Sequence, residues 1–477
     1  MRTTITLALA AALAAPAAAA DKPLSLHPDN PHYFLFRGKP AVLLTSGEHY
    51  GAVLNLDFDY IPYLDELKER KFNLTRTFSG TYREDPSAFG IVDNTLAPAP
   101  KRFLCPWARS STPGALDGGA KFDLKAYDDA YFARLKDFVA QAGKRGVVVE
   151  LSLFCAVYDD KLWDLSPMKA DNNVNGVGKG GRLDLYNLKD KELTDLQEAL
   201  VRKIVSELKD YDNLYYEICN EPYFGGVTKE WNDRMAAVIA DAEKGLPARH
   251  LIAQNISNGS AKVGEPNPHV GVLNFHYCSP PDAVAFNFGL DRAVGFDETG
   301  FRGQADRPYR TDGWDFFAAG GAVYSNLDYS YSASHPDGTA DVTTSPGGGG
   351  IVLRRQLTVL KEFMDVLDFV YMKPDNGVVR DGRITLPLAG APAAAKETPA
   401  ATVRVLAESG KAYAVYVKGG VKAELSLDLP KGQYKAEWLN TKTGAVDKAE
   451  DFDHDGGPRT LASPAYEEDV ALRIRAK

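Results

Sequence analysis

Asn213-Leu-Tyr-Tyr-Glu-Ile-Cys-Asn-Glu-Pro222 carries the clearest structural signal in this chain of 477 residues. Aromatic and branched side chains dominate the stretch, and that composition predicts a short buried β-strand. Pro222 has no backbone N–H to donate, so the chain has to leave the sheet there. Glu221 is therefore expected at the carboxyl end of a strand, where barrels and open α/β sheets place functional groups. The alternative is a carboxylate that only caps an ordinary strand end.

A second stretch of the same kind, Ala293-Val-Gly-Phe-Asp-Glu298, ends in a carboxylate and is followed by Thr299-Gly300. Glu298 follows Glu221 by 77 positions, which fits three β/α repeats of about 25 to 30 residues each. Two carboxyl groups about 5 Å apart, one neutral and one ionised, are what a retaining glycosidase requires. The pair predicts a (β/α)8 TIM barrel, an α/β fold, with both glutamates at its mouth.

The other segments of the expected barrel follow from hydrophobic periodicity. Long loops at 83–122 and 156–189 are expected to wall a cleft over the mouth. Strands are expected at 41–45, 72–78, 146–154, 251–254, 271–277 and 321–328, and helices at 58–71, 124–143, 193–209, 229–242 and 353–371. Glu217 lies on the same side of its strand as Glu221, so it is expected to point into the barrel and to pair with Arg76 or another base.

Asn220-Glu221-Pro222 with Glu298 resembles the large glycoside hydrolase superfamily that places its acid/base after strand four and its nucleophile after strand seven. Family 5 cellulase-like enzymes are its best-known members, and the resemblance covers residues 30–375 as an architecture, with the hairpin at 32–40 plugging the barrel floor. It implies double displacement with retained configuration, in which Glu298 attacks and Glu221 serves as acid and then as base. It also implies β-glycosides, or the equivalent α-L-arabinosides, in oligo- or polysaccharides as substrates.

The resemblance extends to other residues. It implies that Arg76 supports Glu298, because a guanidinium stays charged and holds a carboxylate in fixed geometry; the alternative is an arginine in an ordinary buried ion pair. It implies that Asn220 binds the sugar 2-hydroxyl. In the family pattern His-x-Tyr, the tyrosine stands two positions after the histidine. His276 matches the histidine, but Tyr277 follows it directly and so stands one position before the expected tyrosine. Further substrate contacts are expected from residues at the ends of the first and eighth strands: Glu48, His49 and Asn326.

From about residue 376 the pattern changes to short alternating runs. Such runs predict an antiparallel β-sandwich. The expected organisation is a signal peptide at 1–20, a catalytic barrel with its hairpin at 21–375 and the sandwich at 376–477. Trp438 is the only tryptophan of the sandwich, so we expect a domain that supports the barrel rather than an independent binder.

Residues 1–20 combine Arg2, an apolar core and an Ala-x-Ala ending, which is typical of a cleavable signal peptide and predicts a secreted or periplasmic protein. The formal net charge of −9 disfavours nucleic acid and membrane surfaces as partners. No Cys/His spacing matches a zinc site, and we expect no metal or cofactor. Disulfides and buried free thiols both remain open for the four cysteines, Cys105, Cys155, Cys219 and Cys278.

Two other functions stay open at this point: a transglycosylase that uses the same site, and a non-catalytic carbohydrate-binding protein on a TIM barrel. Binding alone does not need both glutamates together with Asn220 and Arg76, which favours the enzyme. The sequence leaves open the sugar and linkage, endo or exo action, the ligand of the sandwich and the oligomeric state.

Overall fold

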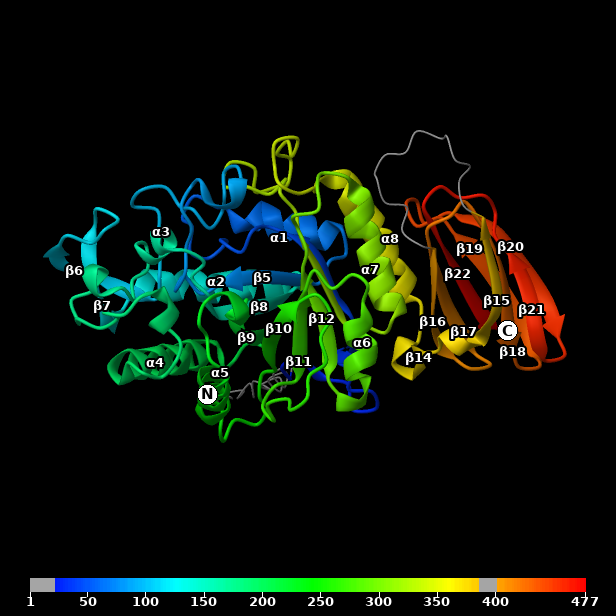
Figure 1. Ribbon diagram of the computed structural model, residues 1–477, viewed down its shortest axis with the longest axis horizontal. Coiled ribbons are helices and arrows are strands. Elements are labelled where there is room, and N and C mark those ends of the chain that lie inside the picture. The colour runs from blue at the N-terminus through cyan, green and yellow to red at the C-terminus, as the bar shows by residue number, and fades with distance from the viewer. Residues whose placement is uncertain (1–21, 386–400) are drawn as a thin grey trace, which may run out of the picture.

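The computed structural model describes residues 22–385 and 401–477, so the expected signal peptide lies outside the described residues. Its centre is an eight-stranded parallel sheet in the order β4-β13-β12-β11-β10-β9-β8-β5 (Figure 1). The predicted TIM barrel is thereby confirmed. The strands are β4 (Leu43–Gly47), β5 (Leu74–Phe78), β8 (Val148–Cys155), β9 (Leu214–Asn220), β10 (Ile252–Asn258), β11 (Val272–His276), β12 (Ala293–Glu298) and β13 (Val323–Leu327).

The first and last strands of that order, β4 and β5, are joined through Asn73. Its backbone N–H donates to the Leu44 carbonyl oxygen at 3.2 Å, and its side-chain oxygen accepts from the Leu44 N–H at 3.0 Å. A side chain therefore substitutes for part of the backbone ladder where the barrel closes.

Helices surround the barrel, and aspartate or threonine side chains cap several of them. Asp59, Asp128, Asp190 and Thr228 each accept a hydrogen bond from a backbone N–H of the first helical turn. Among the described residues, no helix is both long and apolar enough to cross a membrane. The helices are α1 (Tyr60–Glu69), α2 (Asp129–Lys144), α4 (Lys191–Leu208), α5 (Lys229–Ala242), α6 (Asp282–Asn287), α7 (Asp306–Ala318) and α8 (Ile351–Asp365).

An N-terminal antiparallel sheet lies at the amino ends of the barrel strands: β1 (Ser25–Leu26), β2 (Phe34–Phe36) and β3 (Lys39–Ala41). The Leu24 N–H donates to the Asp212 carbonyl oxygen just before β9, and Leu26 lies beside Gly271 just before β11. This sheet therefore covers the end of the barrel opposite the two glutamates.

The long excursion at 83–122 contains a feature that the sequence did not predict. A two-stranded ribbon, β6 (Trp107–Pro113) with β7 (Ala120–Tyr127), projects from the barrel (Figure 1). The helix expected from Leu124 begins only at Asp129, because residues up to Tyr127 belong to β7. The second loop holds short helical turns, α3 (Asp160–Trp163), η2 (Ala170–Asn172) and η3 (Arg182–Asp184).

The C-terminal region is an antiparallel β-domain, as predicted. One sheet has the order β14-β16-β17-β22-β19-β20 and the other β15-β18-β21. Three strands, β14, β20 and β21, were not predicted. β14 has only two residues, and β20 lies at a sheet edge with five of its nine residues exposed, so its sequence lacks hydrophobic alternation. The strands are β14 (Lys373–Pro374), β15 (Val379–Thr385), β16 (Thr402–Glu408), β17 (Ala412–Lys418), β18 (Lys422–Leu429), β19 (Gly432–Leu439), β20 (Val446–His454), β21 (Gly457–Ala462) and β22 (Asp469–Ala476).

The β-domain packs against α7 and α8 of the barrel (Figure 1). The Tyr416 ring stacks on Trp314 with centroids 5.7 Å apart. The buried guanidinium of Arg310 donates to Asp469 at 2.6 Å and to Glu468 at 2.6 Å. The two parts of the chain thus share both an apolar contact and a buried ion pair.

Truncation after Pro374 is expected to give insoluble or unstable protein. It exposes the apolar surface of α7 around Trp314 and removes the ion pair of Arg310 with Asp469 and Glu468. Solubility and the thermal unfolding midpoint measure the effect. The milder variant Asp469→Asn, which keeps the whole chain, should lower the midpoint in the same direction. A soluble and fully active truncate would contradict a supporting role for the β-domain.

Candidate active site

The two glutamates stand at the carboxyl ends of their strands. Glu298 is the last residue of β12, and Glu221 follows β9 directly. Glu221 has left-handed backbone angles (φ 45°, ψ 53°), and Pro222 begins a short 3-10 helix, η4 (Pro222–Phe224). A non-glycine residue in this conformation is strained, and such strain often marks functional sites. One oxygen of Glu221, one oxygen of Glu298 and a ring nitrogen of His276 all lie within 4.8 Å of one another.

Glu298 is only 6% exposed and is surrounded by hydrogen-bond donors. It accepts hydrogen bonds from the hydroxyls of Tyr50 at 2.8 Å and Tyr277 at 3.1 Å, and from Arg76 Nη1 at 3.2 Å. Burial alone would raise the pKa of Glu298. The charge and the hydrogen bond of His276 lower this pKa well below its usual range, and the charge of Arg76 and the hydrogen bond from Tyr50 add to the effect. Glu298 is therefore ionised at neutral pH.

Glu221 has different surroundings. It accepts a hydrogen bond from the Tyr158 hydroxyl at 2.5 Å, and His276 Nδ1 lies 3.1 Å from its other oxygen. Within the described part of the chain, no arginine or lysine forms an ion pair with it. One carboxyl group thus has a permanent cation and the other does not, which is the asymmetry that separates a nucleophile from a general acid.

Arg76, on β5, connects the site to the barrel interior. Its Nη2 donates to Asn220 Oδ1 at 2.6 Å and to Glu217 Oε2 at 2.5 Å, while Nη1 reaches Glu298. Its guanidinium also lies 4.6 Å from the centre of the Tyr50 ring, a cation–π contact. The prediction that Glu217 points inward and pairs with Arg76 is confirmed.

Arg76→Ala is expected to lower kcat about 100-fold or more while the fold survives, because Glu298 loses its fixed partner. Removing the cation should also raise the pKa of Glu298, so the acid limb of the pH–rate profile should move to higher pH. Arg76→Lys is the matched control, since it keeps the charge but not the planar fork; it should lose turnover with a smaller shift of the acid limb. Circular dichroism checks the fold. Near wild-type turnover of Arg76→Ala would make Arg76 a structural residue.

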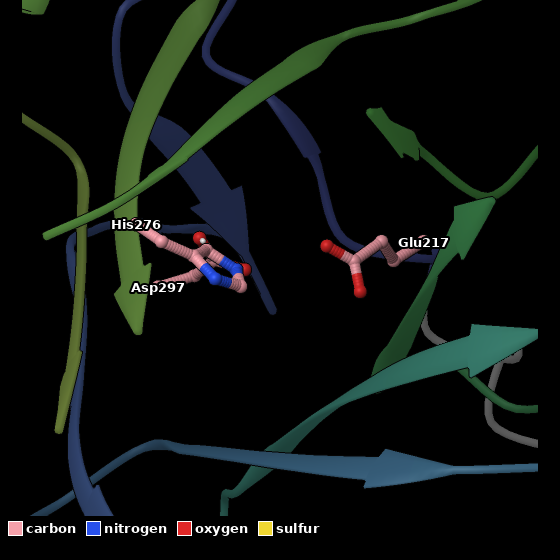
Figure 2. A group of neighbouring side chains, drawn as sticks. All are labelled: Glu217, His276 and Asp297. Atoms are coloured by element: carbon pink, nitrogen blue, oxygen red, sulfur yellow. Dashed lines mark ion pairs between the residues drawn. The ribbon is translucent and has the colours of Figure 1, made fainter. Parts of the chain in front are cut away.

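His276 lies between the glutamates and a third acid, Asp297. Its Nε2 is 3.6 Å from Asp297, which is itself 3.5 Å from Arg76 Nε, and all three are buried. Figure 2 shows the His276 ring beside Asp297, with Glu217 facing them from β9. Burial alone would lower the pKa of His276, but the charges of Glu298 and Asp297 raise it well above its usual value. The acids around His276 therefore favour its protonated form.

Glu217, His276 and Asp297 offer atoms within 4.8 Å of one another, a spacing compatible with a metal ion. The guanidinium of Arg76 contacts both acids, at 2.5 Å and 3.5 Å. Two cations of the protein, Arg76 and His276, already balance the charge of the cluster, and we assign it no metal.

A cavity of about 330 Å³ opens over the glutamates. Of the residues expected to bind substrate, His49, Asn220 and Tyr277 line it. Arg76 and His276 lie beneath and reach the glutamates instead. The full lining is His49, Tyr50, Phe78, Glu84, Phe89, Leu96, Tyr158, Asn220, Glu221, Phe224, Asn258, Tyr277, Glu298 and Phe301.

Two expected substrate contacts, Glu48 and Asn326, do not line the cavity. The carboxylate of Glu48 accepts hydrogen bonds from the N–H groups of Gly51 and Ala52 and from the Thr95 hydroxyl. It therefore stabilises the turn of the loop in which it lies. Asn326 is buried in β13 and donates to the Leu327 carbonyl oxygen at 3.2 Å. Both side chains bond within the protein, and a contact of either one with substrate stays a prediction.

Tyr277 reaches Glu298 although it stands one position before the family's tyrosine. Its backbone φ of 49° is left-handed. Sequence reasoning missed Tyr50 as a partner of Glu298 and Tyr158 as a partner of Glu221. Tyr50 lies three residues after the end of β4, in the segment already expected at the barrel mouth, which was the one signal available. Tyr158 lies in the long loop at 156–189, where hydrophobic periodicity does not predict the position of a side chain.

All four cysteines are buried free thiols. This settles the alternative that the sequence left open. Cys155 and Cys219 lie in the neighbouring strands β8 and β9, and Cys155 accepts a hydrogen bond from Asn220 Nδ2 at 3.4 Å.

The architecture resembles several solved structures of low sequence identity. A family 5 glycoside hydrolase from Bacteroides vulgatus ATCC 8482 gives a TM-score of 0.61 at 13% identity, covering 95% of this chain and 93% of its own. Another protein of that organism, provisionally described as a glycoside hydrolase, gives 0.65 at 14% identity, with 96% and 83% covered. A structure described as a glycoside hydrolase gives 0.61 at 13% identity, with 96% and 97% covered. These similarities establish the fold. No curated protein matches the sequence.

The sequence itself matches a family. Residues 102–280 match the model of the cellulase family, glycosyl hydrolase family 5. The matched region contains Glu221 and His276 and ends before Glu298, which the barrel brings next to them. Part of the barrel therefore matches the family 5 glycosyl hydrolase model, and this match supports a glycoside hydrolase.

Proposed function

We propose that the protein cleaves β-linked, or stereochemically equivalent α-L-arabinosidic, bonds by double displacement with retention of configuration. The observation that carries this proposal is the approach of the two carboxylates, whose nearest oxygens lie within 4.8 Å. Retaining enzymes hold their carboxyl groups about 5 to 5.5 Å apart, whereas inverting enzymes leave about 6.5 to 9.5 Å for a water molecule. The family resemblance extends the proposal to oligo- or polysaccharides as the carbohydrate partner.

In the first step, Glu298 attacks the anomeric carbon while Glu221 gives its proton to the leaving oxygen. The glycosidic bond breaks as an ester bond forms between the sugar and Glu298. In the second step, Glu221 takes a proton from water, and the hydroxide attacks the anomeric carbon and releases Glu298. The same group thus serves as acid and then as base.

The surrounding residues fit these roles. Arg76, Tyr50 and Tyr277 keep Glu298 ionised and oriented, so that it needs no rearrangement before attack. Asn220 is fixed through Arg76 and lines the cavity beside Glu221, which supports a contact with the sugar 2-hydroxyl. Such a contact strengthens as the transition state forms.

The reaction's stereochemistry tests this proposal. Proton NMR of the first product from an aryl β-glycoside should show the β-anomer before mutarotation. A first product in the α configuration would mean inversion and would remove the covalent intermediate. Repeating the reaction with added methanol separates hydrolysis from transglycosylation, because a transglycosylase yields mainly the methyl glycoside. Failure to turn over any glycoside of a broad aryl panel would favour a carbohydrate-binding protein.

We further propose that the protein acts outside the cytoplasm, on the basis of residues 1–20 alone. N-terminal sequencing of protein recovered from the cell exterior or periplasm should begin at Asp21. Intact Met1 on protein confined to the cytoplasm would contradict the proposal.

A further inference from the structure

Three exposed phenylalanines surround the mouth of the cavity: Phe89, Phe224 and Phe301, here called the phenylalanine rim. Their exposed fractions are 44%, 50% and 41%. They come from the loops after β5, β9 and β12, so separate parts of the sequence place large apolar groups at one opening. Exposed apolar side chains that gather at a pocket indicate a binding surface.

The rim forms a continuous aromatic wall through Tyr158. The Phe89 ring lies 5.3 Å from Tyr158 and 6.3 Å from Phe301, and the Phe224 ring lies 5.9 Å from Tyr158. Phe89 also holds left-handed backbone angles (φ 54°, ψ 9°), a costly conformation for an aromatic residue. That strain is retained at a side chain that covers no core, which favours a role in binding.

Tyr158 and Phe224 place this wall on the side of the cavity where the leaving group must lie, and Phe301, three residues after Glu298, joins it through Phe89. A general acid has to reach the leaving oxygen, so the groups around Glu221 face the leaving group rather than the sugar that is attacked. Tyr158 donates to Glu221, and Phe224 follows Glu221 by three residues.

The part of the cavity formed by the loop after β4, which contacts Glu298 through Tyr50, has the opposite character. His49 Nε2 lies 3.3 Å from Glu84, and His49 Nδ1 is buried without a partner in the structure. The His49 ring lies beside Tyr50, which donates to Glu298. These polar groups suit the hydroxyls of the sugar that is attacked.

The tyrosine hydroxyls near the rim are already used. The Tyr158 hydroxyl bonds to Glu221 and Asn220, and the Tyr223 hydroxyl donates to Asn258 at 2.6 Å. A buried sugar hydroxyl without a partner costs free energy, whereas an apolar group gains by burial. None of the five tryptophans lines the cavity; all are buried, with Trp163 at 5% the most exposed.

We propose that the leaving group of the natural substrate is an apolar aglycone, alkyl or aryl, that packs against the phenylalanine rim. This inference rests on the proposed function, because it uses Glu221 as the acid. It narrows the oligo- and polysaccharides that the family resemblance implies, since the rim offers surface to a hydrocarbon and few free partners to a second sugar.

Three substrates with the same sugar test the inference: an octyl β-glycoside, a β-linked disaccharide and a glycosyl fluoride. The sugar is the one preferred in a panel of 4-nitrophenyl glycosides. The wild-type kcat/KM should be about 100-fold higher for the octyl glycoside than for the disaccharide. Phe89→Ala and Phe224→Ala should each lower the octyl value about tenfold, as expected for the loss of about 50 Å² of apolar contact. Both should leave the fluoride value unchanged, because fluoride does not reach the rim.

Phe286→Ala is the matched control, since Phe286 is 49% exposed and lies outside the cavity. It should change none of the three values. A disaccharide cleaved as well as the octyl glycoside, or rim variants that lower the fluoride and octyl values equally, would overturn the inference and leave the proposed function intact. A wild-type protein that hydrolyses none of the three would overturn the proposed function and this inference together.

Discussion

Glu298→Ala is expected to abolish turnover of every glycoside, with kcat lower by about 10⁵-fold or more. The variant removes the group that forms the covalent bond, and no neighbour can replace it. Tyr50, Tyr277 and Arg76 point at the lost carboxylate as donors, and none of them is a nucleophile at neutral pH. Steady-state kinetics on an activated aryl glycoside measures the loss.

The surface variant Glu265→Ala controls for the loss of one negative charge, because Glu265 is exposed and lies outside the cavity. It should keep wild-type kinetics. Residual activity of Glu298→Ala above about 1% of wild type would be incompatible with a nucleophile at this position.

Glu221→Ala should produce a large loss that depends on the substrate. Substrates with a poor leaving group should lose about 10³-fold in kcat, because general acid catalysis contributes about 10² to 10⁴. Dinitrophenyl glycosides need no protonation of the leaving oxygen, so their first step should be spared. Added azide should then intercept the glycosyl-enzyme and give a β-glycosyl azide, which product NMR identifies.

The two variants together assign the roles. A β-glycosyl azide from Glu298→Ala, or an α-glycosyl azide from Glu221→Ala, would reverse the assignment of nucleophile and acid, because only the variant that keeps the nucleophile gives an azide of retained configuration. The structure favours the assignment made here, because Arg76 pairs with Glu298 and not with Glu221.

The barrel could be predicted because seven of its eight strands are buried throughout and most of their residues are apolar. Every residue is buried in seven strands: β4, β5, β8, β9, β11, β12 and β13. Proline or glycine then marks where a strand ends, so Glu221 and Glu298 were placed from sequence. The ribbon β6–β7 and the edge strand β20 were missed because their exposed polar residues hide the alternation.

The direction of a side chain at a strand end is a different matter. Glu48 and His49 are neighbours at the mouth, yet Glu48 turns to the N–H groups of Gly51 and Ala52 while His49 lines the cavity. The direction of each side chain depends on the backbone N–H groups that the tight loop exposes, and hydrophobic periodicity does not predict where those groups lie. Asp297 was likewise not singled out, because its contact with His276 depends on how two strands are paired.

The covalent intermediate itself is the most direct test of double displacement. A 2-deoxy-2-fluoro glycoside with a dinitrophenyl leaving group should inactivate the enzyme. The fluorine slows both steps, while the good leaving group keeps the first step fast enough for the covalent intermediate to accumulate. Mass spectrometry of the digested protein should find one fluorosugar on the peptide that contains Glu298. A fluorosugar on Glu221 would make Glu221 the nucleophile and Glu298 the acid. Turnover of the reagent with inverted configuration and no labelled peptide would contradict double displacement.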